Sequence, residues 1–117
     1  MTEEELKLRC KKMALRVIQL AMSLPKNVVS IVLSKQVVRS ATSVAANYRS
    51  ACKARSKADF ISKLGIVEEE ADETQLWLEL IIESNLMKSS RIDDLLNEVR
   101  QLTAIFAASR ITARKNK

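Results

Sequence analysis

Residues 56–82 read SKADFISKLGIVEEEADETQLWLELII, and their pattern sets the architecture of the chain. Apolar and small residues recur every three or four positions, which is the period of one face of an α-helix. Ser56 precedes this run and Asp59 follows three residues later, so the pair predicts a capped N-terminus. We therefore predict a helix over residues 57–85, with a core face formed by Phe60, Leu64, Val67, Ala71, Thr74, Leu78 and Ile82.

Three other segments show the same period and predict helices over residues 3–24, 28–54 and 91–112. Pro25 ends the first of them, and Ser89 and Ser90 are expected to cap the last. The predicted core faces are Leu6, Cys10, Met13, Val17, Leu20 and Leu24 in the first helix, Leu33, Val37, Ala41, Val44, Tyr48 and Ala51 in the second, and Ile92, Leu95, Leu96, Val99, Thr103 and Phe106 in the last.

The composition is that of an all-α protein. The chain contains one Gly and one Pro, whereas sheets and long loops need many more of both. Its 117 residues allow one hydrophobic core, and short connections place consecutive helices antiparallel. We predict a single domain, residues 1–117, folded as an antiparallel up-down-up-down four-helix bundle. Gly65 lies inside the third helix at a cost of about 1 kcal/mol relative to Ala, and we expect close packing to explain it.

The residue types exclude most catalytic sites. There is no His, which removes Ser–His and Cys–His nucleophile pairs and imidazole metal ligands. Cys10 and Cys52 are far apart in the sequence, so we interpret them as free thiols. The acids of residues 68–73 crowd one helix, and they lack the His or second acidic helix that would complete a metal site. We predict no enzyme activity, no metal and no cofactor.

The sequence contains no signal for export or membrane insertion. Glu3, Glu4 and Glu5 occupy the place of the basic region of a signal peptide. The longest apolar runs are too short to span a bilayer. We therefore expect a cytoplasmic protein with reduced thiols and no membrane contact.

Charge is distributed unevenly along the chain. Residues 1–57 contain twelve Lys or Arg and three Glu, whereas residues 58–117 contain eight Lys or Arg and eleven acids. Between Leu64 and Met87 there are seven acids and no base. The first half is therefore suited to an acidic partner, and the second half is suited to a basic one.

The third predicted helix has a second apolar face, opposite its core face. This face contains Ile66, Leu76, Trp77 and Leu80, with Glu69 and Glu73 among them. The first helix has a second row as well, formed by Leu8, Leu15 and Met22. Scattered apolar residues are normal on surfaces, but a row around a Trp is typical of an interface. We expect the face on the third helix to mediate self-association.

A basic ridge runs along the second predicted helix, opposite its core face. It consists of Lys35, Arg39, Arg49 and Lys53. Three interpretations stay open: a solvated face, a face that docks onto the third helix of a neighbouring copy, or a phosphate-binding face. In the second interpretation, Arg39 and Arg49 pair with carboxylates of the neighbouring copy. The first candidates for those carboxylates are Glu69 and Glu73.

Other bases are candidate nucleic-acid contacts. They are Lys7, Arg9, Lys11, Lys12 and Arg16 of the first helix, together with Lys35 and Lys53 of the second. The bases of the first helix are expected to lie apart from the faces that serve assembly. Aromatic residues make up only 3% of the chain, so stacking on unpaired bases is not expected. Binding to RNA should instead depend on charge and on salt.

Four motifs in the sequence are distinctive. They are LSKQVVRSATSVAANYR at residues 33–49, RSKADFISKL at 55–64, EEADET at 69–74 and WLEL at 77–80. Together they resemble the bacterial four-helix bundle protein family, whose first members were found encoded within intervening sequences of 23S ribosomal RNA genes. The resemblance covers about residues 15–112. The commoner branch of that family has Asn-Ile-Ala-Glu-Gly where this chain has NYRSA at 47–51, which places the chain in a side branch.

The resemblance implies an up-down-up-down bundle, a homopentameric ring and no enzyme activity. A related bundle, the accessory variability protein of diversity-generating retroelements, implies a nucleic-acid or reverse-transcriptase partner. We hypothesise that the protein is a homo-oligomeric bundle that binds RNA or a nucleic-acid-bound protein through basic surfaces. The alternative is a structural scaffold whose charged faces serve self-assembly alone.

Overall fold

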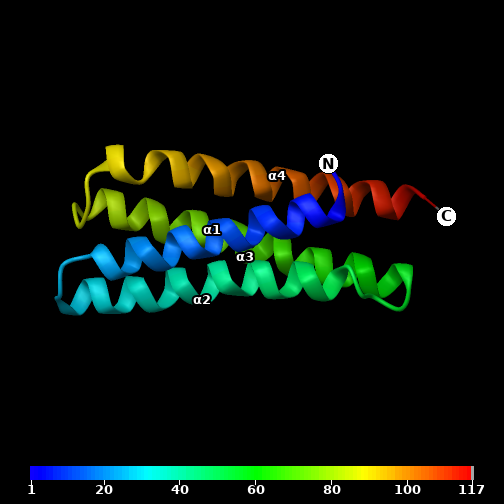
Figure 1. Cartoon of the computed structure of the whole chain (residues 1–117), viewed down its shortest axis with the longest axis horizontal. Helices are drawn as coiled ribbons and strands as arrows, with labels where there is room; N and C mark the ends of the chain where they lie inside the picture. The colour runs from blue at the N-terminus through cyan, green and yellow to red at the C-terminus, as the bar shows by residue number, and fades with distance from the viewer. Residues whose placement is uncertain (117) are drawn as a thin grey trace.

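The computed structural model describes residues 1–116 and consists of four long α-helices. They are α1 (Glu3–Ser23), α2 (Val28–Ala51), α3 (Lys57–Glu83) and α4 (Asp93–Lys115), with a 3-10 turn, η1 (Ser89–Arg91), before α4. Consecutive helices run antiparallel (Figure 1), and residues 1–116 contain no strand. The predicted all-α four-helix bundle is confirmed.

Side-chain caps fix the starts of the first three helices. Thr2 forms a capping box with Glu5 at the start of α1. Ser56 caps α3, as predicted, by accepting a hydrogen bond from the Asp59 N–H at 3.0 Å. Asn27 caps α2 in the same way. These side chains satisfy backbone donors that a helix leaves free at its N-terminus.

The start of α4 differs from the prediction. Ser89 and Ser90 form the 3-10 turn instead of a cap, and α4 begins at Asp93 without a side-chain cap. Ile92, at the junction, is fully buried, so apolar packing fixes this corner of the chain. The carboxylates of Asp93 and Asp94 lie in the first turn of α4, where they interact favourably with the helix dipole.

Some helix ends also differ from the expected positions. α2 ends at Ala51, before the expected residue 54, and α3 ends at Glu83, before residue 85. Asn85 has a positive φ of 61°, which is a left-handed conformation typical of residues just beyond a helix end. α4 continues to Lys115, beyond the expected residue 112.

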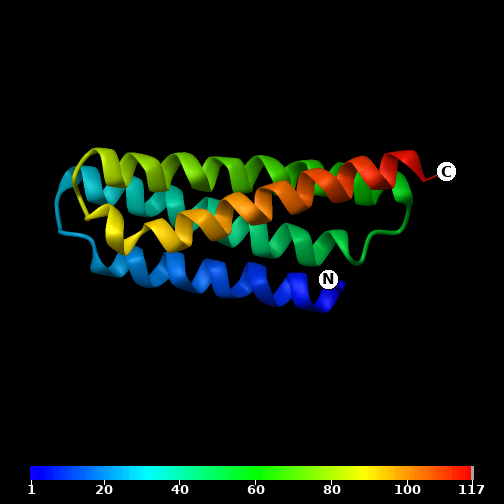
Figure 2. The same ribbon diagram turned by 90° about the horizontal axis from the view of Figure 1, so that it is seen from above.

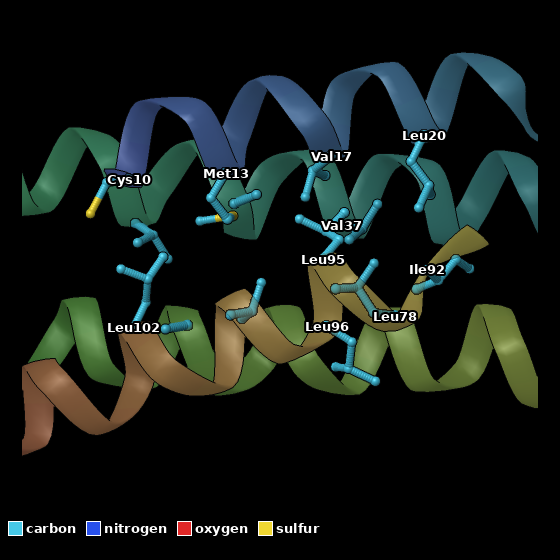
Figure 3. Close-up of a cluster of buried hydrophobic side chains, with 14 of the residues drawn as sticks. Cys10, Met13, Val17, Leu20, Val37, Leu78, Ile92, Leu95, Leu96 and Leu102 are labelled. Carbon is cyan, nitrogen blue, oxygen red and sulfur yellow. The ribbon is translucent and has the colours of Figure 1, made fainter. Parts of the chain in front are cut away.

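The hydrophobic core fills the space between the four helices (Figure 3). Every core residue predicted for the first two helices is buried. In α3, Ile81 is fully buried and Ile82 only half-buried, and Phe60 is also half-buried. In α4, Leu102 takes the buried place predicted for Thr103. Such shifts of the buried position by one residue are expected in long helices. A spacing that alternates between three and four residues averages 3.5 per turn, whereas the helix has 3.6, so the predicted face gradually rotates away from the core.

Gly65 does not have the close neighbour that was expected for it. A Cβ atom at this position would meet no atom of another helix within 4 Å, and no side chain beyond its two chain neighbours. Close packing therefore does not explain this glycine, and its cost to the helix is uncompensated in the protomer.

The connections divide between the two ends of the bundle. The α1–α2 and α3–α4 connections lie at one end, and the α2–α3 connection, Met1 and the end of α4 lie at the other (Figures 1 and 2). The bundle measures 49 × 21 × 20 Å. Inside it, the Thr74 hydroxyl lies 2.8 Å from the Ser40 hydroxyl, and this buried hydrogen bond fixes the register of α2 against α3.

Candidate interaction surfaces

Positive charge is concentrated on the hairpin formed by α1 and α2. Residues 6–56 contain eleven Lys or Arg and no Asp or Glu. Carboxylates that neutralise these bases must come from α3, from α4 or from residues 3–5. The bases that find no such partner carry the positive potential available for binding.

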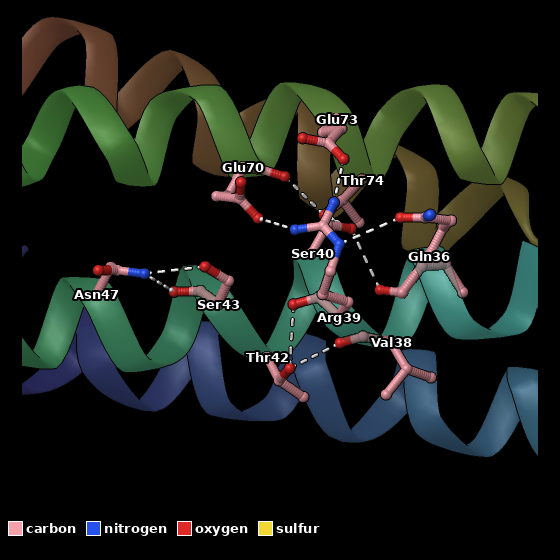
Figure 4. A network of polar contacts seen from close by, with 11 residues as sticks. Gln36, Val38, Arg39, Ser40, Thr42, Ser43, Asn47, Glu70, Glu73 and Thr74 are labelled. Carbon is pink, nitrogen blue, oxygen red and sulfur yellow. Dashed lines mark hydrogen bonds and ion pairs between the residues drawn. The ribbon is translucent and has the colours of Figure 1, made fainter.

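Arg39 pairs with two carboxylates of its own chain (Figure 4). Its Nη1 atom donates to Glu70 at 2.9 Å, and its Nη2 atom contacts Glu73. Gln36 accepts a hydrogen bond from Arg39 Nε at 3.1 Å, which orients the guanidinium. The predicted pairing with Glu73 is correct, but the expectation that it joins two subunits is wrong.

The register of α2 and α3 explains this outcome. Because Ser40 and Thr74 are hydrogen-bonded, the residues beside them on the two helices lie within a turn of one another. An Arg side chain is long enough to cross the seam between neighbouring helices from a position on the outer face. The Arg39 side chain stays 48% exposed, so the pair is partly screened by solvent.

Arg9 is also neutralised within the chain. Its Nε and Nη2 atoms donate to the two carboxylate oxygens of Glu98 on α4, at 3.0 and 2.5 Å. The two side chains are 26% and 22% exposed, so this bidentate pair is shielded from solvent more than the Arg39 pair. Arg9 is therefore engaged inside the protomer, and its prediction as a nucleic-acid contact stays a prediction.

A groove lies between α1 and α2, with a volume of about 430 Å³. Three bases line it: Lys7 and Lys11, one turn apart on α1, and Arg49 on α2. The rest of its lining is small or aliphatic, and consists of Ala14, Leu15, Ile18, Thr42, Ala45 and Ala46. The sequence assigned the three bases to two separate surfaces, and the structure brings them together in this α1–α2 groove. The expectation that Lys7 and Lys11 lie apart from α2 is therefore wrong.

Two of the groove bases have no ion-pair partner within residues 1–116, namely Lys11 and Arg49. Lys7 Nζ lies 2.9 Å from Glu4, and this hydrogen bond raises the pKa of Lys7. The Glu4 side chain is 82% exposed, so it screens the groove weakly. The groove is thus suited to a partner that combines acidic and apolar side chains.

The other four predicted nucleic-acid contacts are exposed on the hairpin. Lys12 and Arg16 lie one turn apart on α1, and Lys35 and Lys53 belong to α2 and the residues that follow it. None of the four has an ion-pair partner in the described part of the chain. They keep the exposure that a phosphate contact requires.

The outer face of α3 exposes an apolar row, as predicted. Ile66, Leu76 and Leu80 are 43%, 45% and 38% exposed. Glu69 lies on the same side, is exposed and has no ion-pair partner among residues 1–116. We call these four residues the α3 outer row.

Trp77 differs from its prediction as the centre of that face. It is half-buried and packs against the core. Its indole N–H is buried and has no hydrogen-bond partner within residues 1–116. The ring therefore contributes to the stability of the protomer, and the exposed row is aliphatic and acidic.

One exposed apolar cluster at the α1–α2 connection was predicted only in part, through Met22 of the second row of the first helix. Its members are 47–81% exposed and comprise Met22, Val28, Val29, Ile31 and Val32. The run VVSIVL at residues 28–33 is apolar on every side of a helix, which indicates contacts beyond the core of the protomer. That run was the available signal in the sequence.

The two cysteines are free thiols in different environments. Cys10 is fully buried, and burial raises its pKa to about 12. Cys52 is half-buried beyond the end of α2, where burial raises its pKa and a hydrogen bond with Tyr48 opposes that rise. Low-pKa, reactive thiols need the opposite surroundings.

The described residues 1–116 contain no group of three or more His, Cys, Asp or Glu that could hold a metal ion. Within the same residues, no helix combines the length and the hydropathy that crossing a bilayer requires.

Comparison with known proteins identifies the family and a similar structure. A family model described as 23S rRNA-intervening sequence protein matches residues 4–108. The chain is also similar to a crystal structure of a protein with unknown function from the S23 ribosomal protein family of Bacteroides thetaiotaomicron. The two are 34% identical with a TM-score of 0.86, over 94% of this chain and 98% of that one. No curated protein matches the chain. The resemblance indicated by the four motifs is confirmed.

Proposed function

Since this chain belongs to the 23S rRNA-intervening sequence protein family, we propose that it is a non-enzymatic, self-associating bundle that binds the phosphate backbone of RNA. The observation that carries this proposal is the set of exposed, unpaired bases on the α1–α2 hairpin. This set includes Lys12, Arg16, Lys35 and Lys53, which lie outside the α1–α2 groove. The resemblance to the family implies five copies in the assembly.

The charge of the hairpin supports a polyanionic partner. Its residues 6–56 contain eleven Lys or Arg and no acid, so like charges lie close together along the hairpin. A polyanion relieves their repulsion, and its binding gains free energy from the counterions that it releases. Self-association multiplies the number of contacts that one RNA molecule can make. The descriptions of the family and of the similar structure refer to ribosomal RNA and to a ribosomal protein family, which favours RNA over other polyanions.

The aromatic residues support recognition of phosphate over recognition of bases. Tyr48 and Phe106 are buried against each other, with ring centroids 5.6 Å apart. Phe60 and Trp77 are half-buried. Residues 1–116 thus expose no aromatic ring of the kind on which unpaired bases stack. Contacts to phosphate position a protein on RNA but do not select a sequence.

A titration of labelled, structured RNA at several salt concentrations tests this function. We expect affinity to fall with salt, with a log–log slope of roughly 0.7 to 0.9 per phosphate contact. Lys12→Glu combined with Arg16→Glu should weaken binding to all RNA sequences alike and reduce the slope. The control combines Lys88→Glu with Arg114→Glu, because these exposed bases lie outside the hairpin and give the same change in net charge.

Two outcomes would contradict RNA binding through the hairpin. One is the absence of binding at low salt, or binding that ignores salt. The other is an equal loss of affinity in the hairpin variant and in the control. Either result would favour the alternative function, a structural scaffold, which the exposed aliphatic rows on α1 and α3 also support.

A further inference from the structure

We infer that the α3 outer row of one copy docks into the α1–α2 groove of a second copy, at the same height along the bundle. This inference rests on the self-association proposed above and adds its two faces and their register. The groove offers bases beside an aliphatic surface, and the row offers Glu69 beside aliphatic side chains. The two faces are therefore complementary in charge, and both also present aliphatic surface.

Heights on α3 follow from its register against α2. The hydrogen bond between Ser40 and Thr74 places these two residues level. Because the two helices are antiparallel, each step backward along α3 corresponds to a step forward along α2. Glu69, five residues before Thr74, therefore lies level with Ala45, five residues after Ser40. By the same count, Leu76 lies level with Val38.

Heights on α1 follow from the lining of the groove. Lys7 and Lys11 of α1 line it together with Ala45 and Arg49 of α2, and these helices are also antiparallel. The lining spans residues 7–18 of α1 and 42–49 of α2, and matching the centres of these two spans places Lys11 within about one helical turn, 5.4 Å, of the height of Ala45. Seven residues further along α1, Ile18 lies level with Val38 to the same precision.

The two registers together place complementary groups at equal heights. Glu69 lies within about one helical turn of the height of Lys11, and Leu76 lies within the same distance of the height of Ile18. Copies related by rotation about an axis parallel to the bundle are not displaced along it, so only groups of equal height can meet. In that arrangement acid meets base and aliphatic meets aliphatic. The two faces belong to different helices and differ in charge, so the contact is head-to-tail, which is the kind of contact that closes into rings.

The lining of the groove favours a helix over a nucleic acid as its occupant. Ala14, Ala45 and Ala46 have short side chains, and small residues let a second helix approach closely. A phosphate backbone would leave the aliphatic part of the groove facing a polar partner. The bases Lys12 and Arg16 do not line the groove, so docking of α3 leaves them exposed for the proposed binding of RNA.

Charge reversal tests the docking. Light scattering at micromolar concentration should give the wild type a mass that is a multiple of 13.2 kDa. Lys11→Glu and Glu69→Lys should each raise the midpoint concentration of assembly at least about tenfold, because like charges then face each other. The double variant, Lys11→Glu with Glu69→Lys, should restore assembly. Lys12→Glu is the matched control, since it changes the same charge at the next residue, outside the groove, and assembly should persist.

Cysteine cross-linking tests the register. In a background with Cys10→Ala and Cys52→Ser, the pair Ile18→Cys and Leu76→Cys should form disulfides between copies. The pair Leu8→Cys and Leu80→Cys is the control, because the same counting places these positions about 20 Å apart in height, and it should not cross-link. Circular dichroism checks that each variant remains helical.

The outcomes separate the two proposals. An oligomeric wild type whose assembly ignores both charge reversals, or that cross-links only through the control pair, overturns the docking while self-association stands. A wild-type mass of 13.2 kDa overturns self-association as well. Restoration in the double variant, together with cross-linking of the level pair alone, is the result expected from docking at equal height.

Discussion

The guanidinium of Arg39 joins α2 to α3 through bonds to Glu70 and Glu73. The Glu70 side chain is only 17% exposed, so it loses its cation in a poorly solvated place when Arg39 is removed. We expect Arg39→Ala to lower the free energy of unfolding by about 1 kcal/mol. Lys35→Ala, which removes an unpaired base of the same helix, should change it by less than about 0.5 kcal/mol. Urea unfolding followed by circular dichroism measures both, and equal losses would contradict a stabilising role for the Arg39 pair.

The two thiols should differ in their reaction with iodoacetamide. The thiolate is the reactive form, and Cys10 is both fully buried and raised in pKa to about 12. We expect mass spectrometry to find one modification per chain at pH 8, on Cys52, and two in urea. Raising the pH toward 9 should accelerate the reaction of Cys52 and leave Cys10 protected. Rapid double modification of the folded protein would show that Cys10 is accessible.

At the scale of a helix, Gly65 is a position where a substitution should make α3 more stable. No atom of another helix lies within 4 Å of a Cβ at this position, and Ala restricts the unfolded chain more than Gly does. We expect Gly65→Ala to raise the free energy of unfolding by about 0.5 to 1 kcal/mol, measured as a higher urea midpoint. Ala108→Gly, at an exposed position of α4, is the opposite control and should lower it by a similar amount. A loss of stability in Gly65→Ala would indicate a packing partner for Gly65.

The predictability of each element depends on whether the relevant interaction is local. The three-and-four period identified the helices, and Ser56 with Asp59 identified the start of α3, because both signals lie within a few residues. The sequence predicted that Arg39 pairs with a neighbouring copy, whereas the pair forms within one chain. Hydrophobic periodicity predicts the direction in which a side chain leaves its helix, but it does not predict the register of that helix against its neighbours. The α1–α2 groove was divided between two surfaces for the same reason. Ile81 replaced Ile82 in the core because small angular errors accumulate along a long helix.

At the scale of the whole molecule, the division of charge between the two halves of the sequence becomes a division between faces. The hairpin of α1 and α2 is basic, whereas α3 carries exposed Glu69 and Asp72. Pairs within the chain, such as Arg9 with Glu98 and Arg110 with Glu68, neutralise part of this charge at the contacts of α4. The unpaired remainder has opposite signs on different sides of the protomer, and in the proposed assembly this charge would orient one copy against the next before contact.

The placement of the chain ends gives the bundle a direction. Met1 and the end of α4 lie at one end, together with the α2–α3 connection (Figure 1). In an assembly whose copies are not displaced along the bundle, every N-terminus would emerge from one rim, and the apolar cluster around Val28 would lie at the opposite rim. Copies of a peptide fused to Met1 would then lie close together in a ring at one end of the assembly. Such a ring of peptides would bind a multivalent target far more tightly than a single copy, because neighbouring copies raise the local concentration of the peptide.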